Sequence, residues 1–347
     1  MENTKRNYGI DLLRIVSMMM VTLLHVFGQG GILSSTAGVN AKIVWFFEIA
    51  AFCAANCYAV ISGYVGVNSK HKYTNIIVLY LQVIFYTLLI ALAYGIYKPL
   101  LLSEGVFYRA LFPFIFNHYW YFTAYFCLFF FMPFINKMLL SLSKREIKTL
   151  AITILSVFTI LPTIFHCDVF NLNAGYSALW IIALYVFGGC IKLLDFSFLS
   201  KKSVFGIYAL CVILSWLNKF YIPYPKDGFF VSYISPTMLI AAASLVILFS
   251  KLNIGKYGAK VISFFAPLSF GVFLIHTHPL VWHHWLFNRY VEFSHYTTVK
   301  MICVSLLAAL SIWLICSLID GVRHLVFKVL RIKKLFLSVE NKIVEKK

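Results

Sequence analysis

The chain has 347 residues, of which 61% are hydrophobic and only 12% are charged. Soluble globular proteins carry about 25% charged residues, so this composition excludes a protein surrounded by water and indicates a surface that mostly faces lipid. The formal net charge of +18 would suggest a nucleic-acid partner in a soluble protein, but we expect no nucleic acid here. In a membrane protein, an excess of lysine and arginine reports orientation instead.

Ten mostly apolar segments have about the 20 residues that a helix needs to cross a bilayer. In chain order, the predicted spans are 10–27, 43–64, 73–97, 119–140, 147–165, 174–194, 204–222, 235–249, 261–287 and 299–318. In the ninth span, Pro267 and Gly271 indicate a kink or a break. The pattern predicts an all-α polytopic membrane helix bundle of about ten transmembrane helices.

The loops between these spans alternate in charge. Of the 30 lysines and arginines, 22 lie before the first span, after even-numbered spans or in the tail, and seven lie in the opposite loops. Because basic residues collect on the cytoplasmic side, this asymmetry predicts that both termini are cytoplasmic. We expect a transmembrane domain over residues 1–320 and a basic cytoplasmic tail over 321–347, the one stretch whose composition suggests disorder.

The first span carries ionisable side chains, which are costly in lipid and are therefore functional candidates. Arg14 and His25 are eleven residues apart, about 20° beyond three full turns, so they share one helix face roughly 16 Å apart along the axis. Asp11 lies three residues before Arg14, a spacing that permits pairing. The alternative reading is structural: an interfacial Asp11–Arg14 pair, and a His25 that merely bonds a neighbouring helix.

A comparison of depths brings more residues to the outer third of the bundle. His25 and His276 each lie 15 residues into an outward-running span, and four residues of the even spans reach the same depth: Glu48, His118, Trp120 and Tyr121. Imidazole titrates near neutral pH and a carboxylate can orient it, so the group suits proton transfer. An aromatic belt at the interface would equally account for Trp120 and Tyr121.

The end of the ninth span concentrates four histidines: His276, His278, His283 and His284. No cysteine stands near them, and Glu292 is the one nearby acid in the sequence. We therefore expect no metal site there.

Several short motifs carry a resemblance to a known family. Residues 8–14 (YGIDLLR), followed by ten residues and His25, resemble the N-terminal signature of the bacterial acyltransferase-3 family. Residues 61–64 (ISGY), 118–122 (HYWYF, with Pro133 further on) and 271–276 (GVFLIH) are similar to later motifs of that family, in the same order. The resemblance extends from about residue 8 to residue 318, which is nearly the whole chain.

The resemblance implies an activity. It implies a multi-pass protein of the bacterial cytoplasmic membrane that moves an acetyl or other acyl group from cytoplasmic acyl-CoA to a hydroxyl of a cell-surface polysaccharide or glycolipid. Acyl-CoA is then a co-substrate, and no permanently bound cofactor is expected. The residue matching His25 is the family's general base, and the one matching Arg14 handles acyl-CoA. Many members carry paired arginines in the first cytoplasmic loop, where this chain has Lys70 and Lys72 flanking His71.

The expected mechanism places the CoA phosphates near Arg14, Lys70 and Lys72, with the thioester reaching the outer third. His25 then deprotonates the acceptor hydroxyl or is itself acylated transiently, and Glu48 or His276 orients it. His118, Trp120 and Tyr121 are the expected substrate-binding residues. A transporter or flippase of a glycan or lipid is the rival interpretation, although the internal pseudo-symmetry expected of such proteins is not visible in the sequence.

Overall fold

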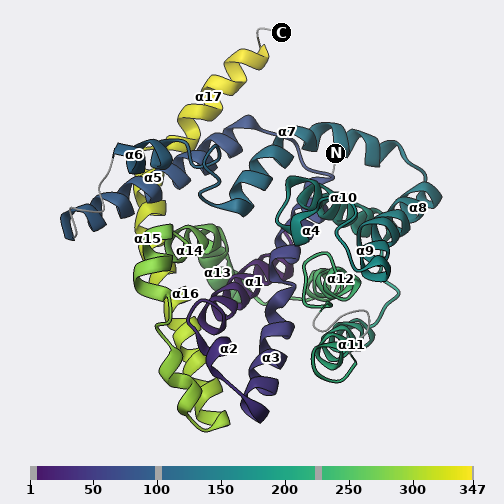
Figure 1. Cartoon of the computed structure of the whole chain (residues 1–347). Helices are drawn as coiled ribbons and strands as arrows, with labels where there is room; N and C mark the ends of the chain where they lie inside the picture. The colour runs from purple at the N-terminus through teal and green to yellow at the C-terminus, as the bar shows by residue number, and fades with distance from the viewer. Residues whose placement is uncertain (1–5, 98–103, 223–228, 346–347) are drawn as a thin grey trace.

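The computed structural model describes residues 6–97, 104–222 and 229–345, and within these ranges helices joined by loops make up the chain and no strand is present. The helices that form the bundle are α1 (Tyr8–Phe27), α3 (Gly38–Phe52), α4 (Ala54–Gly66), α5 (Tyr73–Tyr97), α7 (Trp120–Ser141), α8 (Lys144–Leu155), α10 (Ala178–Leu194), α11 (Lys201–Phe220), α12 (Pro236–Ser250), α13 (Lys256–Phe265), α14 (Ser269–His276) and α16 (Thr298–Val329). Shorter helices connect or extend them: α2 (Ile32–Ser35), α6 (Glu104–Leu111), α9 (Leu161–Phe165), α15 (Pro279–Val281) and α17 (Ile332–Glu345). Figure 1 shows these helices in one bundle.

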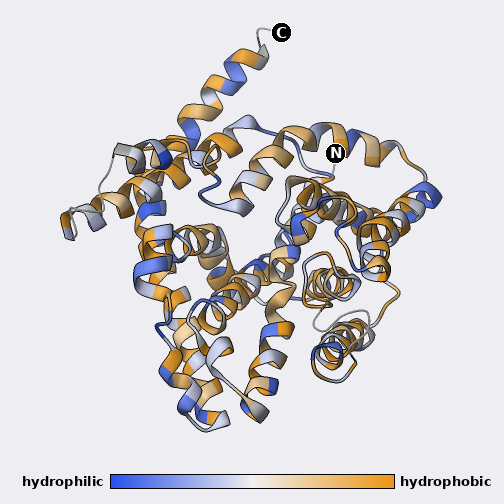
Figure 2. Ribbon diagram, viewed as in Figure 1, coloured by the Kyte–Doolittle hydropathy of each residue, from blue (hydrophilic) through white to orange (hydrophobic). Residues whose placement is uncertain are grey.

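Eight helices or joined helix pairs in the described residues are long and apolar enough to cross a membrane, and two shorter apolar helices, α10 and α12, occupy the remaining two predicted spans. The chain is thus an all-α polytopic helix bundle. Figure 2 shows that hydrophobic residues dominate these helices. Apolar residues cover the outside as well as the interior, because lipid replaces water around the bundle.

The ninth predicted span is broken where the sequence indicated. Helix α13 ends at Phe265, a 3₁₀ turn over Ala266–Leu268 contains Pro267, and α14 starts at Ser269. Proline cannot donate the helical hydrogen bond and its ring clashes with the preceding turn, so the kink is the expected result. The predicted end of this span at residue 287 is wrong, because α14 ends at His276 and the short α15 follows it.

Close helix contacts depend on glycine. Helix α4 packs along α10, and a Cβ atom on Gly63 would lie 1.8 Å from the backbone oxygen of Tyr185. A Cβ atom on Gly188 would lie 2.1 Å from the oxygen of Val60. Small residues let backbones approach where hydrophobic burial gives no advantage, since lipid is as apolar as the partner helix.

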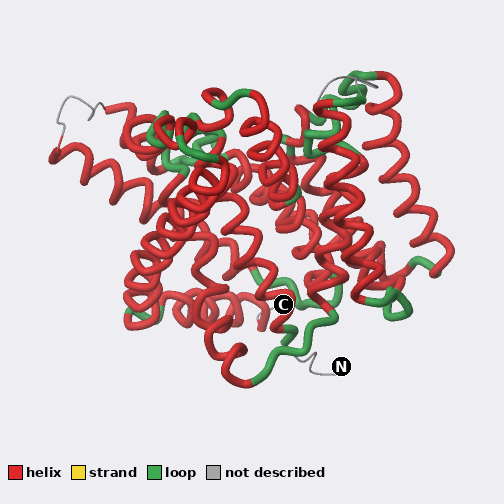
Figure 3. Tube along the Cα trace, turned by 90° about the horizontal axis from the view of Figure 1, so that it is seen from below, coloured by secondary structure: helices red, strands yellow, loops and turns green. Residues whose placement is uncertain are grey.

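The predicted boundary at residue 320 falls inside a helix. Helix α16 continues to Val329, and Arg323, which the charge count assigned to the tail, is buried and donates two hydrogen bonds to Asp320. Asp320 also accepts hydrogen bonds from Gln82 and Tyr86 of α5. Residues 332–345 form α17, so the expectation of disorder is wrong for this part of the tail. Figure 3 shows the helices of the bundle from a second direction.

Candidate active site

Two histidines from opposite ends of the chain meet inside the bundle. His25 lies in the last turn of α1 and His276 at the end of α14, and His25 Nδ1 is 2.8 Å from His276 Nε2. His276 is 1% exposed, while His25 is half-buried and its ring also meets the edge of Trp282, with ring centroids 4.7 Å apart. The structure therefore brings together the two imidazoles that the depth comparison placed at the same level.

The hydrogen bonds of this pair determine which nitrogen is basic. His276 Nδ1 lies 2.5 Å from the backbone oxygen of Val272, which can only accept, so Nδ1 carries the proton. Neutral His276 then accepts through Nε2, and His25 must donate to it through Nδ1. This tautomer leaves the Nε2 lone pair on His25 available. A histidine held in this way can take a proton from a substrate hydroxyl.

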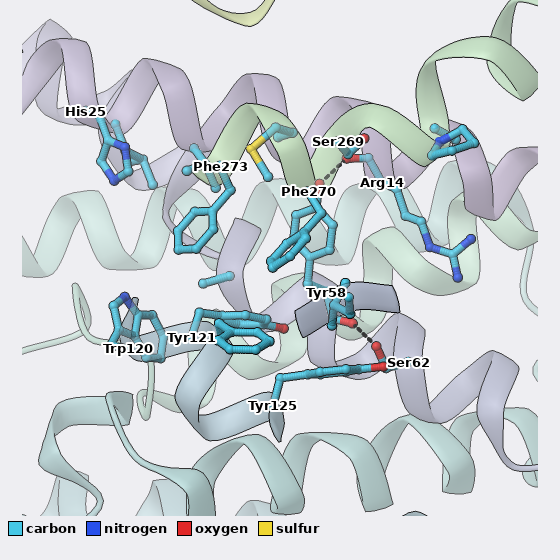
Figure 4. Close-up of a pocket in the computed structure, with 18 of the residues that line it drawn as sticks. Arg14, His25, Tyr58, Ser62, Trp120, Tyr121, Tyr125, Ser269, Phe270 and Phe273 are labelled. Carbon is cyan, nitrogen blue, oxygen red and sulfur yellow. Dashed lines mark hydrogen bonds between the residues drawn. The ribbon is translucent and has the colours of Figure 1, made fainter. Parts of the chain in front are cut away.

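His25 opens into a central cavity of about 250 Å³ that also reaches Arg14. Figure 4 shows the two residues at opposite ends of this cavity along α1, with Tyr58, Tyr121 and Tyr125 on the facing wall. The lining is mostly apolar and aromatic. The Tyr121 hydroxyl is buried and has no hydrogen-bond partner, although buried tyrosine hydroxyls normally have one. The Tyr121 hydroxyl is therefore available to a ligand in the central cavity, between His25 at one end and Arg14 at the other.

A second cavity, of about 310 Å³, adjoins the first at His25 and is here called the aromatic cavity. Its aromatic walls are formed by Tyr119, Trp120, Tyr176, Tyr233, Phe273 and Trp282. His118 also lines it, and burial together with the charge of Arg109 lowers the pKa of His118 to about 4. His118 is therefore neutral near pH 7 and offers a hydrogen bond rather than a charge.

A third cavity, of about 250 Å³, lies at the Arg14 end and is here called the basic cavity. It is lined by Arg14 and by the loop residues Lys70, His71 and Lys72. Burial lowers the pKa of His71, against the charge of Glu340, which raises it. The positive charge of the loop therefore comes from its two lysines.

Arg14 is held at the junction of the basic and central cavities. Its guanidinium pairs with Asp11, whose other oxygen lies 2.5 Å from Nε of Arg6. The Tyr58 hydroxyl donates to the backbone oxygen of Arg14, which fixes this turn of α1 against α4. Since the Arg14 side chain is 30% exposed, donors remain that can reach a ligand in either cavity.

One predicted site residue lies apart from the others. Glu48 is buried on α3 but lines none of the three cavities, and it makes no hydrogen bond to either histidine of the pair. One of its carboxyl oxygens, Oε2, has no hydrogen-bond partner. The sequence predicts a similar depth for Glu48 and His25, but depth does not specify which way a helix faces.

The site also contains residues that the sequence did not single out. Tyr58, Tyr125, Tyr233, Phe273 and Trp282 line the cavities around the histidine pair. In the sequence four of them are aromatic members of predicted spans and Tyr233 lies just before one, and such residues usually pack the core. No local signal distinguishes them from the chain's other aromatic residues. Within the described ranges, no three histidine, cysteine, aspartate or glutamate side chains are grouped to hold a metal ion.

The fold and this site define a membrane-embedded helix bundle with a histidine pair where two cavities meet. An acyltransferase domain model of the acyltransferase-3 family matches residues 7–320, so the chain belongs to that family. No curated protein and no solved structure matches the chain. The protein is therefore a membrane acyltransferase.

Proposed function

We propose that the protein transfers an acetyl group from acetyl-CoA to a hydroxyl of a surface polysaccharide or glycolipid. In this proposal acetyl-CoA binds from the side of the membrane that carries the basic loops, here called the basic side, and the acceptor binds from the opposite side. The observation that carries the proposal is the row of cavities. The basic and central cavities share Arg14, and the central and aromatic cavities share His25. Donor and acceptor can thus approach His25 from opposite ends of one path.

The donor is proposed to lie in the basic and central cavities. Lys70, Lys72 and Arg14 supply positive charge for the phosphates of CoA. Lysine binds phosphate as a point charge and lacks the fork of arginine, so this loop holds the phosphates with less directional constraint than paired arginines would. The apolar walls suit the pantetheine arm, and the unpartnered Tyr121 hydroxyl can bond one of its amides.

The proposed chemistry follows from the tautomer of His25. Its Nε2 takes the proton of the acceptor hydroxyl while that oxygen attacks the thioester carbonyl. A carbon–oxygen bond forms, the carbon–sulfur bond breaks, and CoA leaves as a thiolate that recovers the proton from His25. His276 accepts the Nδ1–H bond throughout and holds the ring in orientation. General-base assistance of this kind contributes typically about 10²- to 10⁴-fold in rate.

The same lone pair would serve a transient acyl carrier, and the two roles differ in one partial reaction. An acyl carrier releases CoA before the acceptor binds, whereas a base needs both substrates. We propose the base role, because the central and aromatic cavities both border His25, so donor and acceptor can be present together. Release of stoichiometric CoA from purified protein without acceptor would contradict it.

The aromatic cavity is the proposed acceptor site. Its aromatic rings offer flat apolar faces against which sugar rings pack, and Asn117 and His118 supply polar groups. Trp120 contacts Tyr176 with ring centroids 4.6 Å apart and also lines the central cavity. An acceptor bound against this wall would lie beside the proposed position of the thioester.

The decisive experiment measures transfer by the purified protein from labelled acetyl-CoA to glycan of the producing cell. His25→Ala should lower the rate at least about 10²-fold. The protein should still be expressed and inserted, because the variant loses a single hydrogen bond between neutral groups. His295→Ala is the matched control, since His295 is exposed and lines none of the three cavities. Normal acetylation by His25→Ala would exclude the base and favour the transporter interpretation.

Arg14 should respond differently from His25. The two residues are roughly 16 Å apart along α1, so Arg14 cannot act on the same proton. Arg14→Ala should raise the KM for acetyl-CoA more than it lowers kcat, and Arg14→Lys should restore donor use only in part if a bidentate contact is made. Equal loss of kcat in both variants, with an unchanged KM, would remove Arg14 from donor binding.

A further inference from the structure

Helix α17 is hydrogen-bonded to the start of α5, beside the loop that carries Lys70, His71 and Lys72. The Glu340 carboxylate accepts hydrogen bonds from the backbone N–H groups of Tyr73 and Thr74 and from the Thr74 hydroxyl. These contacts cap the first turn of α5, where four N–H groups lack helical partners. In Figure 1, α11 and α12 are seen end-on while α17 extends across the page, so α17 runs across the direction of those spans.

The exposed side of α17 carries an apolar stripe. Leu335, Val339 and Ile343 follow one another at intervals of four residues, which places them within about 80° of the helix circumference. They are 57%, 48% and 58% exposed, although Glu340 beside them bonds to the bundle. Figure 2 shows the alternation of hydrophobic and hydrophilic residues along this helix. The stripe thus has no protein partner within the described chain.

The stripe continues a surface that lipid already covers. The last turns of α16 expose Val322, Leu325 and Val329, and Leu330 at the junction is 62% exposed. These side chains extend the exposed apolar surface of α16, which is long and apolar enough to span the membrane. The apolar surface therefore passes from a spanning helix to a helix that lies across it, at the level where the membrane ends.

The charges on α17 and at its start fit the headgroups at that level. Five exposed basic residues follow one another here: Lys328, Arg331, Lys333, Lys334 and Lys342. None of them is in an ion pair among the residues that the structure describes. Clusters of four to eight basic residues next to a spanning helix bind anionic lipid, at about 1 kcal/mol per residue near the surface.

We propose that α17 is an interfacial helix that lies on the basic-side leaflet, with its apolar stripe at the boundary of headgroups and acyl chains and its lysines on anionic phospholipid. Three directions around the helix agree with this placement. Glu340 faces the bundle, Val339 faces lipid, and Asn341 and Lys334 face water. An amphipathic helix of this kind gains stability from buried apolar area and from charge attraction together.

The test uses the full-length protein in nanodiscs of phosphatidylcholine with or without phosphatidylglycerol. A fluorophore is attached at Val339→Cys or at the matched control Asn341→Cys, which lies about 160° round the helix. The exposed Cys167 and Cys303 are first replaced by serine. Quenching is measured with a lipid-borne spin label and with a water-soluble quencher. Both positions are exposed, so neither substitution should disturb folding.

The probe at 339 should be quenched several-fold more by the lipid label, and several-fold less by the aqueous quencher, than the probe at 341. Phosphatidylglycerol should strengthen this difference, and added salt should weaken it. Equal aqueous quenching at both positions would overturn the proposal. Protection from both quenchers at 339 would overturn it in favour of a protein partner. If the difference in quenching between the two probes is the same with and without phosphatidylglycerol, the proposed contact between the lysines and anionic headgroups is wrong.

Discussion

Two polar clusters lie inside this membrane protein, and they differ in how completely their hydrogen bonds are satisfied. Around Asp320, both carboxyl oxygens are occupied by Arg323, and one also accepts from Gln82 and Tyr86. Around His25, the ring nitrogen that remains after pairing with His276 borders two cavities.

The comparison separates a structural role from a chemical one. Both oxygens of the Asp320 carboxylate are already hydrogen-bonded and neither is left for a substrate, so this cluster joins α16 to α5. It also lies against α14, since a Cβ atom on Gly271 would be 2.0 Å from Asp320 Cγ. The histidine pair keeps one lone pair free at the cost of a less complete network. Variants of the two clusters should accordingly affect different measurements.

The largest expected effect is a loss of stability in variants of the Asp320 cluster. Asp320→Ala leaves the Arg323 guanidinium buried without its partner, which should destabilise the protein by about 3–5 kcal/mol. Thermal unfolding of the purified protein in detergent measures the loss. The double variant Asp320→Ala with Arg323→Leu should recover part of it, because no uncompensated charge remains. A double variant no more stable than the single one would show that the pair does not act as a unit.

A smaller effect, on the rate of transfer alone, is expected for variants of the His25–His276 pair. His276→Phe keeps an aromatic ring but removes the acceptor that orients His25, a bond worth about 1.5–3 kcal/mol when the donor becomes charged. The kcat for transfer should fall roughly 10- to 100-fold, with little change in the KM for the donor. An unchanged kcat would mean that His25 needs no orienting partner.

Acidification should act through His118 at the edge of the site. Its pKa is lowered to about 4 in the folded protein, whereas an unfolded histidine titrates near 6.5. As the pH falls from 7 to 5, the unfolded chain gains a proton that the folded one does not bind, so stability should drop by about 2 kcal/mol. The contribution of neutral His118 to stability is present above the pKa of the unfolded histidine and is lost as the pH falls toward the lower pKa of the folded protein. Melting temperatures should fall less steeply with acid in His118→Gln, and parallel curves for both proteins would contradict this assignment.

The smallest expected effect concerns the unpartnered hydroxyl of Tyr121. Tyr121→Phe should raise the KM for acetyl-CoA roughly 2- to 10-fold if one hydrogen bond of about 1 kcal/mol to the pantetheine arm is lost. Tyr208→Phe is the control, because the Tyr208 hydroxyl already donates to the Ala50 backbone and lines none of the three cavities. If the KM is unchanged in Tyr121→Phe, the arm lies elsewhere in the central cavity.

Much of the architecture could be predicted because membrane spans are encoded locally. A run of about 20 apolar residues identifies a span without knowledge of its neighbours. The helical period likewise places Arg14 and His25 on one face of α1, and Pro267 marks the break before α14. Two predicted span ends, at residues 287 and 318, differ from the structure, since α14 stops at His276 and α16 continues to Val329. Apolar composition alone does not show where a helix ends.

By itself, the sequence determined the all-helical membrane class and the approximate spans, because hydropathy and helical rise act along the chain. Only the tertiary structure decided which of the residues at one depth meet. His25 pairs with His276, 251 positions away, while Glu48 at a similar depth lies outside the cavities. The rotation of each helix about its axis determines which side chains face one another, and that rotation depends on packing against neighbouring helices.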